Sequence, residues 1–325
     1  MILVVGATGQ VGSAVVRALR RRGAAVTALL RPSTDAAPIA ATGAAIVRAD
    51  LRDPRSLQSV AAGAECIVAS ANTIVPRRGE RADFDAVAAG YHELGRVSRA
   101  ARARRFLFLS IPREFVGKGA PDFDAKARIE AALHADGPDL TVARASLIMD
   151  VWLPWLGSRL PLRGSRHATL ERGFWLIRLA GAVFQHSLDR YGWASVPGDG
   201  RARHAFITAG DLAEALAAAA VAPEGLGAEL QLGGADVLSW SEVAEIFGRV
   251  LSTRIRTIHN PSAVYRAVSV LARTASPAAS QLLASLAIVA TNDSAYRPDD
   301  TQRLLGGTPT SVEAFLRERL SSSER

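Results

Sequence analysis

Cysteine and paired histidines are nearly absent from this chain of 325 residues. The one cysteine, Cys66, lies within an apolar run, and a single cysteine excludes an intramolecular disulfide framework. The six histidines show no pair at the spacing of a zinc site, so we expect no metal centre. The fold must therefore depend on a hydrophobic core, and a chain of this length can bury one.

Long apolar segments are lacking as well. The longest, residues 282–290, is too short to span a bilayer. The chain opens directly on a short apolar run and a glycine turn, without the basic and apolar regions of a signal peptide. We therefore expect a soluble, cytoplasmic protein with no membrane span.

Lysine is scarce, although the chain is basic. The net charge is +8 and the pI is near 10.6, yet Lys118 and Lys126 are the only lysines. Many arginines gather near the ends of predicted helices, for example at residues 17–22 and 99–105, where cations complement the helix dipole. Because the arginines form no single stripe, we expect no nucleic-acid partner.

The clearest motif present lies in residues 1–21. Ile2–Val5 is an apolar, β-branched run typical of a buried parallel strand, and a helical pattern follows from residue 13. Between them, three glycines at a spacing of three suit a turn that brings a pyrophosphate onto the positive end of a helix. A dinucleotide site is therefore predicted, with a purely structural tight turn as the alternative. The turn residues expected to contact the cofactor are Gly6, Thr8, Gly9, Gln10, Val11 and Gly12.

Apolar runs alternate with helical patterns through the first 150 residues. Strands are predicted at residues 2–5, 25–30, 43–51, 65–73, 105–110 and 140–149. Six strands alternating with helices predict the α/β class, as a Rossmann-type doubly wound parallel sheet. We expect residues 1–150 to form this dinucleotide-binding domain, with residues 202–222 packing back on it.

The character of the sequence changes after residue 150. Residues 151–200 hold four of the five tryptophans and lack a clean alternation of strands and helices. They predict either a second small core or a segment that covers the substrate. Helix caps are expected at Asp211 and Ser239. We expect residues 151–325 to form a smaller, mostly helical substrate-binding region.

The ends of the predicted strands indicate which cofactor is bound. A site for NAD places an acidic residue after the second strand to bind the ribose hydroxyl, whereas a site for NADP places an arginine there. Arg31 occupies this position and can grip a phosphate with two donors, so we expect NADP(H), a solvated loop arginine being the alternative. The end of the fourth strand should line the cofactor crevice with Ala69, Ser70, Ala71 and Asn72.

The spacing G-x-x-G-x-x-G resembles the opening motif of the atypical and extended short-chain dehydrogenases and reductases, and most of all their NmrA-like, NAD(P)H-binding branch, which includes isoflavone-reductase-like enzymes. The resemblance implies that Asp50 and Leu51 contact the adenine. It also implies that Lys126 contacts the nicotinamide ribose and that Ser110 faces substrate or cofactor. The sequence departs from the family at Asp122, which stands where the proton-donating tyrosine is expected, four residues before the lysine.

Lys126 stands out because arginine supplies almost all other positive charge in the chain. A lysine at this position indicates a need for a compact ammonium group with a tunable pKa. We therefore predict Lys126 as a catalytic residue, and the family resemblance implies Ser110 as a second one. Asp122 is a possible acid, although a helix N-cap is the simpler interpretation. His204 is predicted to be a core residue rather than a pocket residue.

The leading hypothesis is an NADPH-dependent reductase of a small, fairly apolar carbonyl, enone or quinone-type compound, with the proton supplied through Lys126 or a water that it holds. One alternative is a non-catalytic, NADP(H)-sensing regulator of the NmrA type. Another is a non-redox isomerase or cyclase that keeps the cofactor as structure. The sequence does not indicate an oligomeric state.

Overall fold

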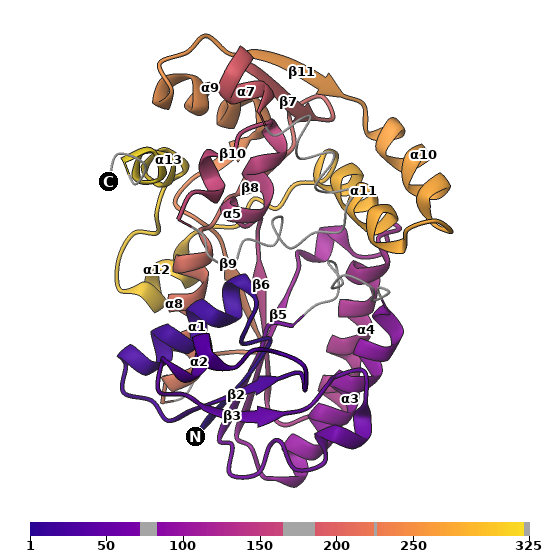
Figure 1. The fold of residues 1–325 in the computed structure, drawn as a ribbon, viewed down its shortest axis with the longest axis vertical. Helices are drawn as coiled ribbons and strands as arrows, with labels where there is room; N and C mark the ends of the chain where they lie inside the picture. The colour runs from indigo at the N-terminus through magenta and orange to yellow at the C-terminus, as the bar shows by residue number, and fades with distance from the viewer. Residues whose placement is uncertain (72–82, 165–185, 224–225, 322–325) are drawn as a thin grey trace.

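The computed structural model describes residues 1–71, 83–164, 186–223 and 226–321, which form a lower sheet lobe and an upper lobe (Figure 1). Seven parallel strands form the central sheet in the order β3-β2-β1-β4-β5-β6-β9, which confirms the predicted doubly wound fold. The strands are β1 Ile2–Val5, β2 Val26–Leu30, β3 Ala45–Arg48, β4 Cys66–Ala69, β5 Arg105–Ser110, β6 Leu140–Ala145 and β9 Glu229–Leu232.

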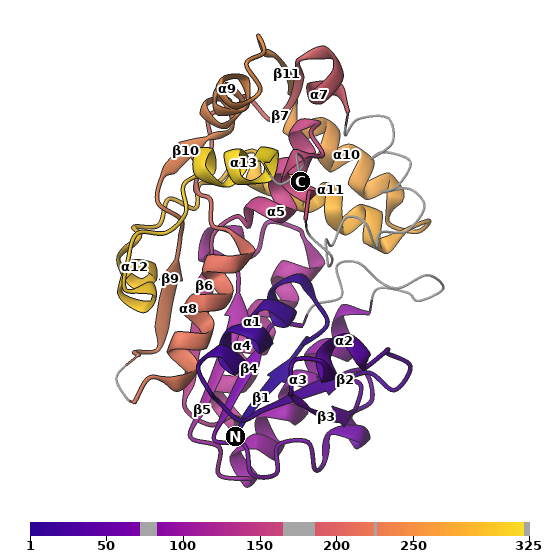
Figure 2. The same cartoon turned by 60° about the vertical axis from the view of Figure 1, so that its left-hand side comes forward.

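Helices cover both faces of this sheet (Figure 2). On one face, α1 (Gln10–Arg21) packs against α8 (Ala209–Val221), and on the other α3 (Phe84–Ala100) packs against α4 (Pro121–Asp136). The strands alternate their side chains between two apolar clusters, so that Val4 and Leu107 face α1 while Leu3 and Phe106 face α3. Shorter elements are α2 Ala37–Ala40, the 3₁₀ turns Pro54–Leu57 and Arg113–Phe115, and α12 Asp299–Leu305.

The chain returns to the sheet lobe after residue 200. Helix α8 packs there against α1, and β9 adds a seventh strand beside β6. The helix cap expected at Asp211 was wrong, because α8 begins one turn earlier. Thr208 caps the helix by accepting a hydrogen bond of 2.9 Å from the backbone N–H of Asp211.

The upper lobe contains a second core. Trp240 lies at its centre, fully buried, and its ring N–H donates to the Val289 carbonyl at 3.1 Å. The helix cap expected at Ser239 is present, and the structure shows it as a capping box with Glu242. The elements of this lobe are α5 Met149–Trp152, the 3₁₀ turns Leu153–Leu156 and Leu160–Leu162, α7 Ser187–Tyr191, β7 Trp193–Pro197, β8 Arg203–Ala205, β10 Val237–Ser239, α9 Trp240–Val250, β11 Arg256–Asn260, α10 Ser262–Ala272, α11 Pro277–Val289 and α13 Val312–Ser321.

The tryptophans of residues 151–200 divide between different surroundings. Trp152 is partly buried against the second core, whereas Trp193 on β7 is exposed. Trp175 lies outside the described residues. In the part of the chain that is described, no helix combines the length and the apolar character needed to cross a membrane.

Candidate cofactor and active site

The glycine turn between β1 and α1 is closely packed. Gly6 has a φ of +87°, and a side chain there would place its Cβ 2.7 Å from the Ala71 nitrogen. A Cβ on Gly12 would lie 2.1 Å from the Gly6 carbonyl oxygen, so α1 can approach the turn only because Gly12 has no side chain. Among the described residues α1 has no acidic side chain in its first turn and no side-chain cap on Gly9. The turn therefore fits a bound pyrophosphate.

Arginines surround the ends of β2 and β3. Arg48 donates to the carbonyls of Arg31 at 2.9 Å and Thr34 at 2.6 Å, which fixes the loop that carries Arg31. The Asp50 carboxylate accepts two hydrogen bonds from the Arg52 guanidinium, at 3.1 and 2.7 Å, and a third from the Arg52 backbone N–H at 3.0 Å. Partial burial opposes ionisation of Asp50, but Arg52 and the charge of Arg31 outweigh it, so the pKa of Asp50 lies below its usual value. The region at the ends of β2 and β3 therefore carries more positive than negative charge, which favours binding of a ribose phosphate. No local sequence pattern indicated the role of Arg48.

Helix α3 contacts the segments that follow β3 and β4. Leu51 is buried, and Gly90 of α3 lies so close that a Cβ there would be 1.8 Å from the Leu51 carbonyl oxygen. Ser70 donates to the Val5 carbonyl at 3.2 Å, and the Ala71 carbonyl accepts from Tyr91 at 2.8 Å.

Ala69 is buried in the core beneath α3. Asn72, also expected in the crevice, lies outside the described residues. Of the predicted crevice residues, Ala71 is the one that lines the cavity described next.

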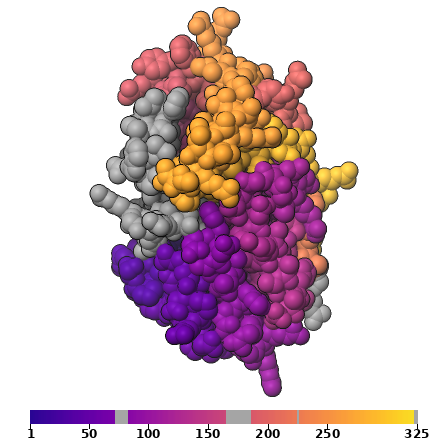
Figure 3. Space-filling model, turned by 90° about the vertical axis from the view of Figure 1, so that its right-hand side faces the viewer, coloured from indigo at the N-terminus to yellow at the C-terminus, as the bar shows by residue number. Residues whose placement is uncertain are grey.

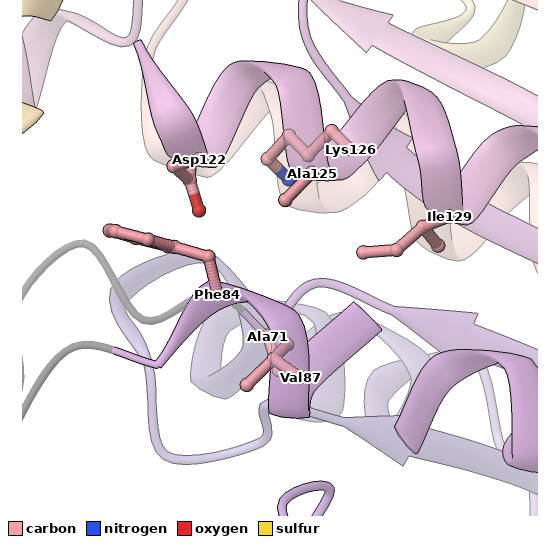
Figure 4. Close-up of a pocket in the computed structure, with 7 residues that line it drawn as sticks. All are labelled: Ala71, Phe84, Val87, Asp122, Ala125, Lys126 and Ile129. Atoms are coloured by element: carbon pink, nitrogen blue, oxygen red, sulfur yellow. The ribbon is translucent and has the colours of Figure 1, made fainter. Parts of the chain in front are cut away.

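A small cavity lies between α3 and α4 (Figure 4). Asp122 and Lys126, one turn apart on α4, point into it from above, and Phe84 and Val87 of α3 lie opposite. The Lys126 ammonium donates to the Leu109 carbonyl at 3.0 Å and lies 5.2 Å from the centre of the Phe108 ring. Lys126 is thus held against the end of β5. The complete lining is Ala71, Phe84, Val87, Asp122, Ala125, Lys126 and Ile129.

Asp122 is buried, and its Oδ2 has no hydrogen-bond partner among the described residues. The N-cap role expected for it was wrong, because Pro121 takes the first helical position and the cap falls on Ala120. Its backbone N–H instead donates to Gln281 of α11 at 2.9 Å. A buried carboxyl group without a partner is costly, which makes Asp122 a candidate for a role in chemistry.

Burial brings the two ionisable groups of the cavity closer in proton affinity. Loss of solvent raises the pKa of Asp122 and lowers the pKa of Lys126, and the attraction between the two groups only partly offsets this. The free-energy difference between a proton on Asp122 and a proton on Lys126 is therefore smaller than for the same groups in solvent. The cavity has a volume of about 10 Å³, enough for about one water molecule. The pair can therefore protonate a ligand that binds against this cavity.

Ser110 lies outside the residues that line the cavity. Its hydroxyl donates to Glu130 of α4, and Glu130 in turn accepts from the buried Arg144 at 3.0 and 2.7 Å. Arg144 also lies 2.8 Å from Glu229 of β9. The group joins α4 to β5, β6 and β9. The assignment of Ser110 as a catalytic residue stays a prediction.

His204 is fully buried in the upper lobe. Its ring nitrogens lie 2.8 Å from the Ser294 hydroxyl and 2.9 Å from the Val289 carbonyl. Burial lowers the pKa of His204 to about 4, so the ring is neutral near pH 7. Within the described ranges, no three histidine, cysteine, aspartate or glutamate residues are grouped in a way that would hold a metal ion.

The sequence is similar to part of a curated protein, sterol demethylase protein B from Methylococcus capsulatus. The two are 40% identical over 111 residues, which cover 33% of this chain and 33% of that protein. The chain therefore matches only about a third of this curated relative's length.

Two solved structures have a similar fold over nearly the whole chain. An NADPH-dependent quinone oxidoreductase from Escherichia coli, complexed with NADPH, is 18% identical with a TM-score of 0.73. A triphenylmethane reductase from a Citrobacter species, complexed with NADP(H), is 18% identical with a TM-score of 0.72. Each match covers 98% of this chain and 100% of the other. At this identity the likeness shows the fold alone.

The NmrA-like family matches residues 1–316, which is almost the entire chain. The parallel sheet agrees with this match. The chain therefore belongs to the NmrA-like family.

Proposed function

We propose that this protein is an NADPH-dependent reductase of a small, fairly apolar carbonyl, enone or quinone-type compound. The observation that carries the proposal is the buried pair of Asp122 and Lys126 in a cavity beside the glycine turn. Ala71 links the two features, because it lines the cavity and also contacts Gly6. A proton donor thus lies next to the predicted cofactor crevice.

The NADPH-bound quinone and triphenylmethane reductases, with the same fold, support the choice of cofactor and reaction class. The sterol-related name of the Methylococcus protein supports an apolar substrate. In this chain the glycine turn would hold the pyrophosphate and Arg31 the ribose phosphate. Asp50 and Leu51 would lie beside the adenine, and Lys126 would bind the nicotinamide ribose.

When bound, NADPH supplies a hydride to the substrate. For a carbonyl substrate, the electron pair of the C=O π bond moves to oxygen, and that oxygen takes a proton from the Asp122–Lys126 pair. The pair then regains its proton from solvent. Phe84 and Val87 limit access of water to the carboxyl group. We assign Ser110 to positioning, because Glu130 takes its hydroxyl hydrogen bond and lies one turn after Lys126 on α4.

A second candidate function is a non-catalytic sensor of NADP(H). The replacement of the expected tyrosine by Asp122 and the engagement of Ser110 by Glu130 favour it. Such a protein would bind the cofactor through the same glycine turn and transfer no hydride.

Steady-state oxidation of NADPH separates the two functions. The purified protein is mixed with NADPH and a panel of quinones, enones and aromatic ketones, and loss of the reduced cofactor is followed by absorbance. The reductase proposal predicts acceptor-dependent oxidation with at least one member of the panel. Tight NADPH binding with no oxidation above the acceptor-only rate would favour the sensor.

A further inference from the structure

Exposed apolar side chains are concentrated on four elements of the upper lobe. Among the described residues, every large apolar side chain that is exposed lies on α7, β7, β11 or α10, except Val221 on α8. We call this surface the apolar tip. Its members are Tyr191, Trp193, Ile258, Val264, Val268, Val270 and Leu271.

Helix α10 is the most unusual part of the apolar tip. Only Ser269 is buried on this helix, and its hydroxyl donates to the Ser280 carbonyl of α11 at 2.8 Å. Val270 and Leu271 are 71% and 78% exposed. Figure 3 shows the orange hairpin of α10 and α11 forming part of the outer surface above the sheet lobe. An apolar helix on an outer surface marks a contact site.

The surroundings of the apolar tip are positively charged. Residues 246–292 contain no aspartate or glutamate. Asp189 is the one acidic residue of α7, and it accepts hydrogen bonds from Ser158 and the Arg159 N–H. None of the arginines of the tip is paired with a carboxylate in the described part of the chain. These arginines are Arg190, Arg254, Arg256, Arg266 and Arg273.

Aromatic residues complete the surface. The rings of Tyr191 and Trp193 lie 6.5 Å apart at the edge of the β7–β11 pair. Tyrosine and tryptophan with neighbouring aliphatic and arginine side chains are the composition of surfaces that sit at the boundary between lipid headgroups and acyl chains. A second copy of the chain is a poorer occupant, because it would set two groups of five arginines against each other.

We propose that the apolar tip docks this protein onto an anionic lipid membrane. The valines and leucine of α10 would enter the boundary region, and the five arginines would contact lipid phosphates. This attachment is peripheral. It is independent of the proposed reductase activity, because vesicle binding needs no cofactor or turnover.

Vesicle flotation tests the proposal with the full-length protein. We expect it to float with vesicles that contain phosphatidylglycerol, and much less with vesicles of phosphatidylcholine alone. Raising the salt concentration should reduce binding, since exposed charges are screened. The variant Val270→Glu/Leu271→Glu should reduce the partition coefficient about ten-fold or more, whereas Val221→Glu should leave it unchanged.

The arginines are tested in the same assay. Arg266→Gln/Arg273→Gln should weaken binding to anionic vesicles, and the control Arg17→Gln/Arg55→Gln on the sheet lobe should not. Circular dichroism is used to check that all variants have the same helix content before their binding is compared. Failure of the wild type to float, or equal flotation of both Val270/Leu271 and Val221 variants, would overturn the proposal. Self-association that the Val270/Leu271 variant abolishes, without vesicle binding, would assign the tip to a second copy.

Discussion

Asp122 is the residue whose environment departs most from its expected role. Burial raises its pKa, so the carboxyl group remains protonated over part of the range in which an ordinary aspartate is ionised. Its protonated form is the acid that the proposed reaction needs. The rate should therefore fall as the pH rises through this raised pKa.

We predict that Asp122→Asn lowers kcat about 10²-fold or more and removes this fall in rate with rising pH. A steady-state pH profile of wild type and variant measures both effects. Asp124→Asn, two residues later on α4, is the control and should keep the wild-type profile. An Asp122→Asn enzyme with wild-type kcat and pH profile would exclude Asp122 as the acid.

Arg31 should decide between the two nicotinamide cofactors. Loss of a hydrogen-bonded charge pair with the ribose phosphate should weaken NADPH binding about ten- to a hundredfold in Arg31→Ala and leave NADH binding nearly unchanged. Fluorescence titration with each cofactor measures this, with Arg55→Ala as an exposed control. If the wild type binds both cofactors equally, the assignment of Arg31 is wrong.

Part of the site could be predicted at the residue scale. The glycine turn and Lys126 could be predicted, because the residue spacing of their motifs is visible in the sequence. The place of Asp122 was not readable, because Pro121 shifts the helix start by one position and Gln281, which holds its N–H, is 159 residues away. Likewise, the engagement of Ser110 depends on Glu130, a contact between a strand and a helix that no local pattern indicates.

At the scale of elements, the approach of α1 to the glycine turn is the critical contact. In Gly12→Ala the new methyl group would overlap the Gly6 carbonyl oxygen, so the helix must move away. We predict a loss of about 3 kcal/mol or more in the free energy of unfolding, together with loss of NADPH binding. Urea unfolding and cofactor titration measure the two effects.

Gly210 provides a matched control for this variant, because it also lies in the first turn of a helix. A Cβ there would lie 3.6 Å from the Thr208 hydroxyl, an ordinary contact. Gly210→Ala should therefore change stability by about 1 kcal/mol or less. If Gly12→Ala proves as stable as Gly210→Ala and binds NADPH normally, the close packing of α1 does not matter for the site.

Most elements of the sheet lobe could be predicted, because the hydrophobic repeat of a strand differs clearly from that of a helix. The pairing of β9 with β6 could not, because more than eighty residues separate Ala145 from Glu229 along the chain. The start of α8 was missed by one turn, since Thr208 and Asp211 both have side chains that can cap a helix.

At the scale of the whole molecule, the two lobes meet at the candidate active site. The side-chain oxygen of Gln281 in α11 accepts a hydrogen bond from the backbone N–H of Asp122, and Gln281 is fully buried. Gln281→Leu would leave that N–H without a partner, which should cost about 1–3 kcal/mol of stability and raise KM. Urea unfolding and steady-state kinetics measure these effects, with the partly exposed Gln302→Leu as control. A fully stable Gln281→Leu protein with unchanged KM would show that this contact does not join the lobes.

The proposed reductase function requires hydride transfer that depends on Lys126, and single-turnover kinetics tests this requirement most directly. Protein loaded with one equivalent of NADPH is mixed with quinone or enone acceptors, and the bound cofactor is followed over time. The account predicts complete oxidation in the wild type and in Lys118→Met, the exposed lysine control, with the rate reduced about 10²-fold or more in Lys126→Met. Bound NADPH that stays intact with every acceptor, or equal rates in the two lysine variants, would contradict it.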